Sequence, residues 1–262
     1  MTMAMAPKTT QREIIGLIPA AGQATRLAPL PCSKELYPVG LKQGGRPKVI
    51  CEYLLDRMRQ AGIRKVYIVL RHGKWDIPAH FGDGTTLDMH IAYLMMNLPF
   101  GVPYTLDQAY PFVRDSLVAL GFPDILFLAD RAFEQLLAQQ VKSDADVVLG
   151  LFPAKRPQKV DMVDFGPDGK VRQIVIKPQK TSLRYAWAIA VWTPTFTHFM
   201  HQHLANAKAG AADAPELFVG HIVQAAIDGG LRVEAVQVSE DPFLDIGTPD
   251  DLAKAAEYLR GM

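Results

Sequence analysis

Ile14-Ile15-Gly16-Leu17-Ile18 runs directly into Pro19-Ala20-Ala21-Gly22 near the start of the chain. A β-branched apolar run that ends in proline and small residues is typical of a buried strand followed by a turn. Apolar residues then recur at helical spacing over residues 47–61, with Gly62 as the C-terminal cap, and residues 65–70 form a second apolar run. This order predicts a βαβ unit, and therefore a parallel sheet with a right-handed crossover.

The remaining pattern continues this α/β alternation. Residues 160–165 and 170–176 flank Gly166-Pro167-Asp168-Gly169, a turn signal that predicts an antiparallel hairpin, so the mostly parallel central sheet is expected to be mixed. Further strands are predicted at 88–93, 116–122, 146–152, 185–192 and 231–238, and helices at 105–112, 133–140, 194–206, 215–228 and from Thr248 onward. We expect a flexible segment at 1–13 and a single domain at 14–262.

Composition narrows the class of protein. The chain has 262 residues, of which 49% are hydrophobic and 21% charged, and a net charge of +1. Such a balance gives no broad basic surface for nucleic acid or an acidic membrane. The polar start of the chain and the lack of a run of about 20 apolar residues favour a cytoplasmic protein. Cys32 and Cys51 lack metal-ligand spacing and cannot form a disulfide scaffold, so they are interpreted as buried or idle thiols.

The loop after the first strand has the composition of a phosphate-binding site. Its residues, Ala20-Ala21-Gly22-Gln23-Ala24-Thr25, are small or polar, and Arg26 and Lys34 follow. Small side chains let backbone N–H groups approach phosphate oxygens, and the two cations supply positive charge. A tight turn also needs small residues for steric reasons alone, so composition by itself leaves both interpretations open.

Two acidic residues follow apolar runs in distant parts of the chain. Asp124 stands in Phe122-Pro123-Asp124-Ile125, and Asp245 in Phe243-Leu244-Asp245-Ile246-Gly247-Thr248. Magnesium takes one or two carboxylates together with substrate phosphates, so two such residues beside a triphosphate would suffice to bind it. Taken singly, either aspartate is more readily explained by turn chemistry than by metal binding.

These segments together resemble the sugar-phosphate nucleotidylyltransferases, especially bacterial UTP:glucose-1-phosphate uridylyltransferases and glucose-1-phosphate thymidylyltransferases. The resemblance is carried by residues 18–29, by Lys34-Glu35-Leu36-Tyr37-Pro38-Val39 and by the two aspartate segments. It implies a Rossmann-like nucleotide-diphospho-sugar transferase fold and a Mg²⁺ ion held by Asp124 and Asp245. Arg26 and Lys34 would be the catalytic cations. The implied nucleotide-binding residues of the loop are Ala20, Ala21, Gly22, Gln23, Ala24 and Thr25, with Ala24 at a position where the family usually has glycine.

The resemblance extends to the acceptor and the base. Ile174-Val175-Ile176-Lys177-Pro178 matches a Glu-Lys-Pro segment in which the lysine binds the phosphate of the sugar phosphate and the glutamate binds sugar hydroxyls. Lys177 is retained, whereas Ile176 replaces the glutamate. Ala188 takes the place of a glycine that lies close to the sugar. Asn97 and Gly101 are similar in position to residues that contact the nucleobase.

The implied reaction joins a nucleoside triphosphate, with UTP or dTTP favoured, to a sugar 1-phosphate and releases pyrophosphate. One alternative is a cytidylyltransferase with a different acceptor, and another is a catalytically silent regulatory paralogue that binds nucleotide or sugar phosphate. A glycosyltransferase ranks lower because Asp144-Ala145-Asp146 precedes its strand instead of ending it. His198, His201 and His203 are interpreted as a solvated helix surface. The base, the sugar and a homo-oligomeric state are left open.

Overall fold

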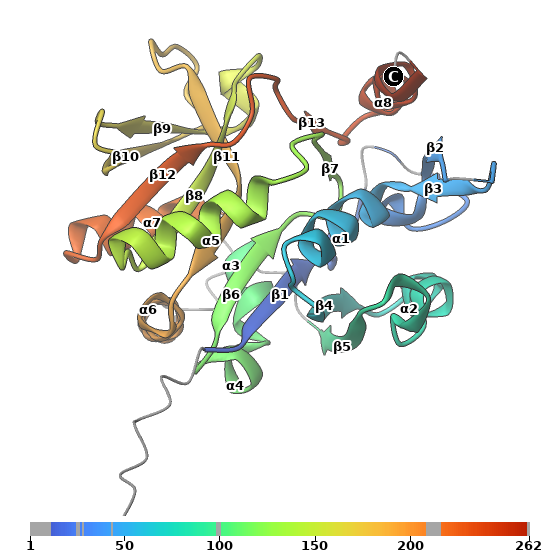
Figure 1. Cartoon of the computed structure of the whole chain (residues 1–262), viewed down its shortest axis with the longest axis horizontal. Helices are drawn as coiled ribbons and strands as arrows, with labels where there is room; N and C mark the ends of the chain where they lie inside the picture. The colour runs from blue at the N-terminus through green and yellow to red at the C-terminus, as the bar shows by residue number, and fades with distance from the viewer. Residues whose placement is uncertain are drawn as a thin grey trace, which may run out of the picture.

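The computed structural model describes residues 12–24, 27, 29–42, 44–97, 101–207 and 216–260. Most of the predicted flexible segment 1–13 lies outside these ranges. A nine-stranded sheet forms the centre of the molecule (Figure 1). Its strands are β1 (Ile14–Pro19), β4 (Lys65–Arg71), β5 (His90–Met96), β6 (Leu117–Gly121), β8 (Val147–Pro153), β9 (Asp161–Phe165), β10 (Val171–Ile176), β11 (Tyr185–Trp192) and β12 (Val233–Gln237).

The first half of the sheet is parallel. β1 pairs in parallel with β4 on one side and with β6 on the other, and β4 pairs with β5. Helix α1 (Ile50–Gln60) connects β1 to β4 together with the preceding loops, which confirms the predicted βαβ unit. The carboxyl ends of these four strands therefore meet at one edge of the sheet.

The second half of the sheet is mixed, as the sequence predicts. β11 runs antiparallel to β6, β8 and β9, whereas β12 is parallel to β8. β9 and β10 form the antiparallel hairpin expected around Gly166-Pro167-Asp168-Gly169. This hairpin continues the order β10-β9-β11-β6-β1-β4-β5, so it lies at the far end of the sheet from β5.

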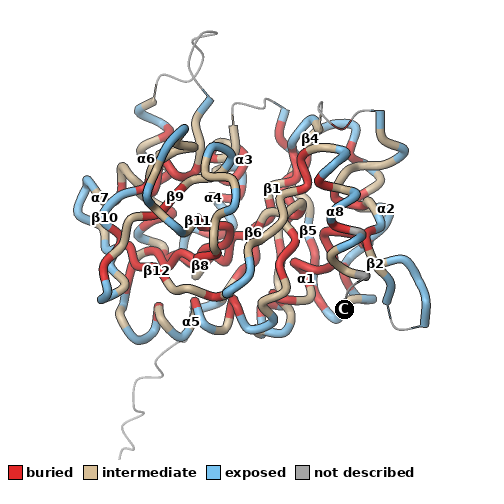
Figure 2. Tube along the Cα trace, turned by 90° about the horizontal axis from the view of Figure 1, so that it is seen from above, coloured by how far each residue is buried: buried red, intermediate tan, exposed pale blue. Residues whose placement is uncertain are grey.

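Helices cover both faces of the sheet, giving three layers. Alternation along β1 shows this directly: Ile15 and Leu17 belong to the core cluster on one face of the sheet, whereas Ile18 belongs to the cluster on the other face. Figure 2 shows the buried segments concentrated along the central strands. The helices are α2 (Asp76–Phe81), α3 (Val102–Asp107), α4 (Tyr110–Val113), α5 (Ala132–Ser143), α6 (Pro194–Asn206), α7 (Val219–Asp228) and α8 (Pro249–Arg260). Across the described residues, none of the helices combines the length and the apolar character needed to cross a bilayer.

Four predicted helices have different bounds in the structure, and α5 differs least because it covers Ala132–Ser143 instead of 133–140. The helix predicted at 47–61 begins at Ile50, because residues 47–49 form β3 (Pro47–Val49), which pairs with β2 (Pro38–Leu41). The helix predicted at 105–112 is two short helices, α3 and α4. Pro111, which has no N–H to donate to a preceding turn, stands in the first turn of α4. Helix α7 begins at Val219 instead of residue 215.

Two very short strands were not predicted, and they connect the C-terminal segment to the centre of the molecule. β7 (Ile125–Leu126) pairs antiparallel with β13 (Leu244–Asp245), beside α8 in Figure 1. A small apolar cluster that includes Ile50, Leu126 and Ile246 holds α8 against this pair. The C-terminal segment is therefore fixed next to the end of β6.

Thr248 caps α8, as the sequence predicts, and its removal has an expected cost. Its Oγ1 accepts a hydrogen bond from the Asp251 N–H at 3.3 Å and donates to Asp251 Oδ2 at 2.7 Å. We expect Thr248→Ala to lower the free energy of unfolding by about 1 kcal/mol, measured by urea denaturation. Thr195→Ala, at an exposed position in the first turn of α6, is the control and should change it by less. Equal losses would contradict the role of the cap.

Candidate active site

The predicted phosphate loop and the first predicted metal ligand lie side by side. The loop at 20–24 follows β1, and Asp124 follows β6, the parallel neighbour of β1. The Ala20 N–H donates to the Val69 carbonyl at 2.8 Å, which fixes the start of the loop against β4. Loops at the carboxyl ends of adjacent parallel strands are where α/β proteins commonly bind their ligands.

The two predicted metal ligands are brought together by the β7–β13 pair. Asp245 stands opposite Ile125 in this ladder, and the Ile246 N–H donates to the Asp124 carbonyl at 3.0 Å. Asp124 and Asp245 thus occupy neighbouring strands although they are far apart in the sequence. In the part of the chain that the structure describes, no group of three or more His, Cys, Asp or Glu side chains could hold a metal. Magnesium needs only one or two carboxylates when phosphates and water complete its shell, so this pair fits it.

Lys34 meets this acidic pair. It opens a short 3₁₀ helix (Lys34–Leu36), and its Nζ forms an ion pair with Asp124 Oδ2; the two side chains are 17% and 18% exposed. Burial alone would lower the pKa of Lys34, but the charge and hydrogen bond of Asp124, with smaller effects of Glu35 and Asp245, raise it above its usual value. The amine is therefore a cation held beside both aspartates.

A second lysine lies just behind Lys34, and the sequence analysis missed it. Lys74 forms an ion pair with Glu35, and both side chains are buried. Burial raises the pKa of Glu35 and lowers that of Lys74, although each partner opposes the shift of the other. Glu35 Oε2 has no hydrogen-bond partner among the described residues. The sequence does hold one signal for Lys74: it stands shortly after the carboxyl end of β4, at the edge of the sheet where the loop after β1 also lies.

A polar cavity of about 440 Å³ opens between the phosphate loop and the segment after β4. Ser33 is anchored at its wall because its N–H and Oγ donate to the Asp76 carboxylate at 2.6 and 2.7 Å. The residues that bear on its chemistry are Gln23, Ala24, Lys34, Arg71, Lys74 and Asp76. Gly22 is exposed in the same loop, whereas the predicted residues Thr25 and Arg26 lie outside the described residues. The cavity thus has cationic groups on one wall and backbone of the loop on the other.

Ala24 adopts a conformation that suits glycine. Its φ is +53°, in the left-handed region, and its carbonyl accepts the Leu27 N–H at 2.9 Å. An L-residue is strained there because its Cβ crowds the backbone. The loop therefore keeps a shape that favours glycine while carrying a methyl group.

We expect Ala24→Gly to stabilise the fold by about 0.5–1 kcal/mol, because the relief of left-handed strain exceeds the extra chain entropy that glycine loses on folding. The matched control is Ala21→Gly, in the same loop, where Ala21 is buried and has no positive φ. There the change should destabilise the protein. Thermal denaturation of both variants measures the difference, and a lower Tm for Ala24→Gly would rule out the strain.

The remaining nucleotide candidates lie near the same edge. Asn97 is exposed directly after β5. Gly101 precedes α3 with a φ of +105°, and a Cβ there would lie 2.7 Å from the Leu217 carbonyl oxygen, so its position has a structural cause. Ala188 is buried at an irregularity in the pairing of β11 with β8. Nothing in the geometry tests base or sugar contacts by these residues, which stay predictions.

Lys177 directly follows β10 and has a φ of +42°, and its Nζ lies 3.4 Å from the centroid of the Phe218 ring. The residue is half-buried, so its amine is held between the hairpin and the segment that leads into α7. Cations are attracted to the face of an aromatic ring, and an incoming anion would compete for this one. Lys177 is thus positioned by the fold and remains the predicted ligand of the acceptor phosphate.

Two other sequence interpretations have structural outcomes. Asp144 and Asp146 lie before β8, at the opposite end of that strand from a ligand-binding edge, and Asp146 Oδ2 accepts the Arg232 N–H at 3.0 Å.

The histidines of α6 are less solvated than expected: His198 Nδ1 lies 3.0 Å from the Tyr110 hydroxyl, and His201 Nδ1 lies 2.9 Å from Asp107 Oδ1. They connect α6 to α3 and α4.

Comparison with known proteins decides the family. A family model described as nucleotidyl transferase matches residues 15–261. The chain belongs to the nucleotidyl transferase family. This membership confirms the resemblance and the enzyme class that the sequence predicts. The matched range includes the predicted phosphate loop, Lys34 and both aspartates.

Curated relatives of this nucleotidyl transferase are themselves named as transferases of nucleotidyl groups. It is 29% identical to glucose-1-phosphate thymidylyltransferase of Xanthomonas campestris over 95% of this chain and 81% of that protein. It is 25% identical to the low-salt glycan biosynthesis nucleotidyltransferase Agl11 of Haloferax volcanii, over 93% of this chain and 65% of that one. The chain therefore spans about two thirds of the length of the Haloferax protein.

A solved structure confirms the Rossmann-like fold. The protein from Bacillus anthracis assigned as a glucose-1-phosphate thymidylyltransferase, crystallised with sucrose, superposes with a TM-score of 0.81 at 19% identity. The match covers 95% of this nucleotidyl transferase and 96% of that chain. At 19% identity this likeness establishes the fold alone. The roles of the site residues rest on their own geometry.

Proposed function

We propose that this nucleotidyl transferase moves a nucleotidyl group from dTTP or UTP to a sugar 1-phosphate and releases pyrophosphate. The observation that carries the proposal is the cluster of Lys34, Asp124 and Asp245 beside the loop that follows β1. A phosphate oxygen as nucleophile is already ionised at neutral pH, so the reaction needs charge stabilisation and alignment instead of a general base. The cluster offers one cation and two oxygen ligands for that purpose.

Asp124 and Asp245 would hold the Mg²⁺ ion. When bound, the metal neutralises phosphate charge and acts as a Lewis acid on the phosphoryl group. The carboxylates fit this role because they are adjacent, oxygen-bearing and located at the edge where the phosphate loop lies. Asp124 also holds the Lys34 amine in place, so the cation stays close to the reacting phosphate.

Lys34 would stabilise the negative charge that grows on the α-phosphate during the displacement. A preorganised cation in a partly dry site is worth more than in water because it needs no reorganisation when the charge develops. The cavity that Arg71 and Lys74 line with Lys34 would receive the leaving pyrophosphate, and backbone N–H groups of the loop around Gly22 would bind its oxygens. Arg26 keeps its predicted role as the second catalytic cation.

Lys177 would bind the phosphate of the acceptor. Its half-buried amine lies at the hairpin end of the sheet, where the resemblance expects the sugar phosphate. Donor and acceptor phosphates would then approach each other across the end of β11, with Lys34 and Lys177 on opposite sides. Bringing two anions together requires cations on both, since their mutual repulsion must be offset.

Pyrophosphate release tests this function. Purified protein is assayed with dTTP, UTP, CTP, GTP and ATP against glucose, galactose, mannose and N-acetylglucosamine 1-phosphates in the presence of Mg²⁺, and products are identified by mass spectrometry. Release with dTTP or UTP and formation of the matching nucleotide sugar is the expected result. Thermal stabilisation by nucleotide without release from any pair would instead favour the silent regulatory paralogue.

A further inference from the structure

Asp161 is a buried carboxylate whose polar contacts are incomplete. It opens β9 and stands directly opposite Ile176 in the antiparallel ladder with β10. Its Oδ1 is shielded from water and has no hydrogen-bond partner among the described residues, while the Gly220 N–H at the start of α7 donates to the carboxylate. Buried polar atoms are nearly always paired in folded proteins, so an unpaired carboxylate oxygen calls for a functional cause.

The surroundings of Asp161 are built to keep the carboxylate in place. A Cβ at Gly220 would lie 2.5 Å from Asp161 Oδ2, so any larger residue there would displace it. Burial raises the pKa of Asp161 to about 6, against the opposing effects of Lys177 and the Gly220 N–H. At neutral pH the group is mostly ionised, and its incomplete solvation disfavours the fold. The folded protein thus keeps a charged hydrogen-bond acceptor that lowers its stability when no ligand is bound.

The location of Asp161 matches a gap in the acceptor site. Ile176 occupies the position where the resemblance expects a glutamate that binds sugar hydroxyls, and Lys177 follows it. Because Asp161 is the register partner of Ile176, its carboxylate is supplied from the neighbouring strand to the same end of the hairpin. Lys177 directly follows Ile176, and its charge opposes the effect of burial on the pKa of Asp161, so the two groups lie near each other at this end of the hairpin.

We propose that Asp161 is a specificity-determining residue of the acceptor site, where its carboxylate accepts a hydrogen bond from a hydroxyl of the sugar whose phosphate Lys177 binds. This inference rests on the proposed function. Asp161 Oδ2 lies against Gly220, so the unpaired Oδ1 is the oxygen left to accept a hydrogen bond from a ligand. A hydrogen bond to a charged acceptor contributes about 10- to 150-fold in binding.

The experiment tests whether Asp161 recognises a single hydroxyl of the sugar 1-phosphate. Wild type and Asp161→Ala are assayed with glucose 1-phosphate, or with the sugar 1-phosphate that wild type uses best, and with its 2-, 3-, 4- and 6-deoxy analogues. We expect wild type to discriminate against one deoxy analogue by about 10- to 150-fold in kcat/KM, and Asp161→Ala to lose that discrimination with an unchanged KM for the nucleotide. Asp164→Ala is the control, since Asp164 lies on β9 in a partly exposed pair with Arg172.

Stability gives an independent readout. At pH 8 the carboxylate is fully charged, so the isosteric variant Asp161→Asn is expected to raise Tm in the unliganded protein, whereas loss of a structural contact would lower it. Should Asp161→Ala fail to fold, Asp161→Asn carries the kinetic test. A variant that keeps the wild-type discrimination against every analogue overturns the role of Asp161. Wild type that releases no pyrophosphate with any acceptor overturns the proposed function itself, and the two failures are thereby distinguished.

Discussion

Lys34→Ala is expected to lower kcat by about 10²- to 10³-fold, the loss typical of removing one preorganised electrostatic group from an active site. The amine is held by Asp124 at the wall of the polar cavity with only 17% of its side chain exposed, so water cannot supply a cation at the same position. The KM for the nucleotide should change less than kcat, because the interaction strengthens as charge develops on the α-phosphate. Steady-state pyrophosphate release measures both.

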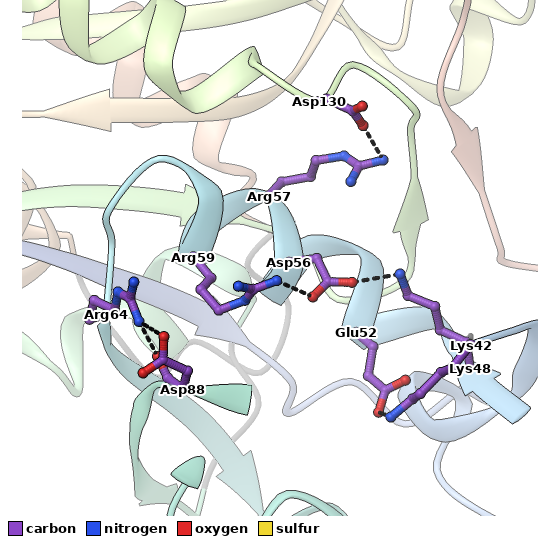
Figure 3. A network of polar contacts seen from close by, with 9 residues as sticks. All are labelled: Lys42, Lys48, Glu52, Asp56, Arg57, Arg59, Arg64, Asp88 and Asp130. Carbon is purple, nitrogen blue, oxygen red and sulfur yellow. Dashed lines mark hydrogen bonds and ion pairs between the residues drawn. The ribbon is translucent and has the colours of Figure 1, made fainter. Parts of the chain in front are cut away.

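Lys48→Ala is the matched control for Lys34→Ala. Lys48 forms an ion pair with Asp56 of α1 at 2.6 Å, and its side chain is 17% exposed, the same fraction as that of Lys34 (Figure 3). It therefore has the same type of contact and the same burial, but lies on β3 away from the phosphate loop. Lys48→Ala should retain wild-type turnover. A Lys34→Ala protein that turns over as fast as Lys48→Ala would remove Lys34 from the catalytic machinery.

Asp124→Asn should be comparably severe, with a loss of at least about 100-fold in kcat/KM. The substitution removes a negatively charged ligand from the pair that would hold Mg²⁺, and it leaves the Lys34 amine without its ion-pair partner. The Mg²⁺ titration of activity should shift to higher concentration, and Asp245→Asn should show the same shift. EDTA should abolish activity in wild type, and added Mg²⁺ should restore it.

Asp130→Asn provides the control for Asp124→Asn. Asp130 lies six residues further along the same segment and is largely exposed, and it forms an ion pair at 2.7 Å with the buried Arg57 of α1 (Figure 3). Its loss removes a charge of the same sign close by without touching the proposed metal ligands. An Asp124→Asn enzyme with the Mg²⁺ titration of wild type and of Asp130→Asn would show that the metal binds elsewhere.

Local patterns were sufficient to predict the elements that carry the fold. The apolar run before Gly22 predicts β1, the Gly166-Pro167-Asp168-Gly169 turn predicts the β9–β10 hairpin, and Thr248 predicts the start of α8. In each case the determining interaction, whether strand burial, turn geometry or a helix cap, involves residues that are close in sequence. Such features can be recognised without knowing where distant segments lie.

Local sequence patterns could not predict the contacts that assemble the site. β7 and β13 have two residues each, and nothing in their own residues indicates that they pair. Lys74 looks like a surface lysine until Glu35 is placed against it. Asp161 looks like an ordinary residue at the start of a strand until Gly220 of α7 is placed against its carboxylate. Each depends on non-local pairing, which the sequence of one segment does not encode.

Under the proposed function, the β7–β13 pair also sets how much of the chain must be synthesised before the site has both acidic residues. The ribosome synthesises the phosphate loop, Lys34 and Asp124 before Leu244 and Asp245, which lie more than 100 residues further along the sequence. A nascent or prematurely terminated chain that stops before Leu244 would have the parallel strands and the loop but only one of the two acidic residues. Under the proposed function, a chain that stops before Leu244 would lack one of the two metal ligands and would not consume triphosphate.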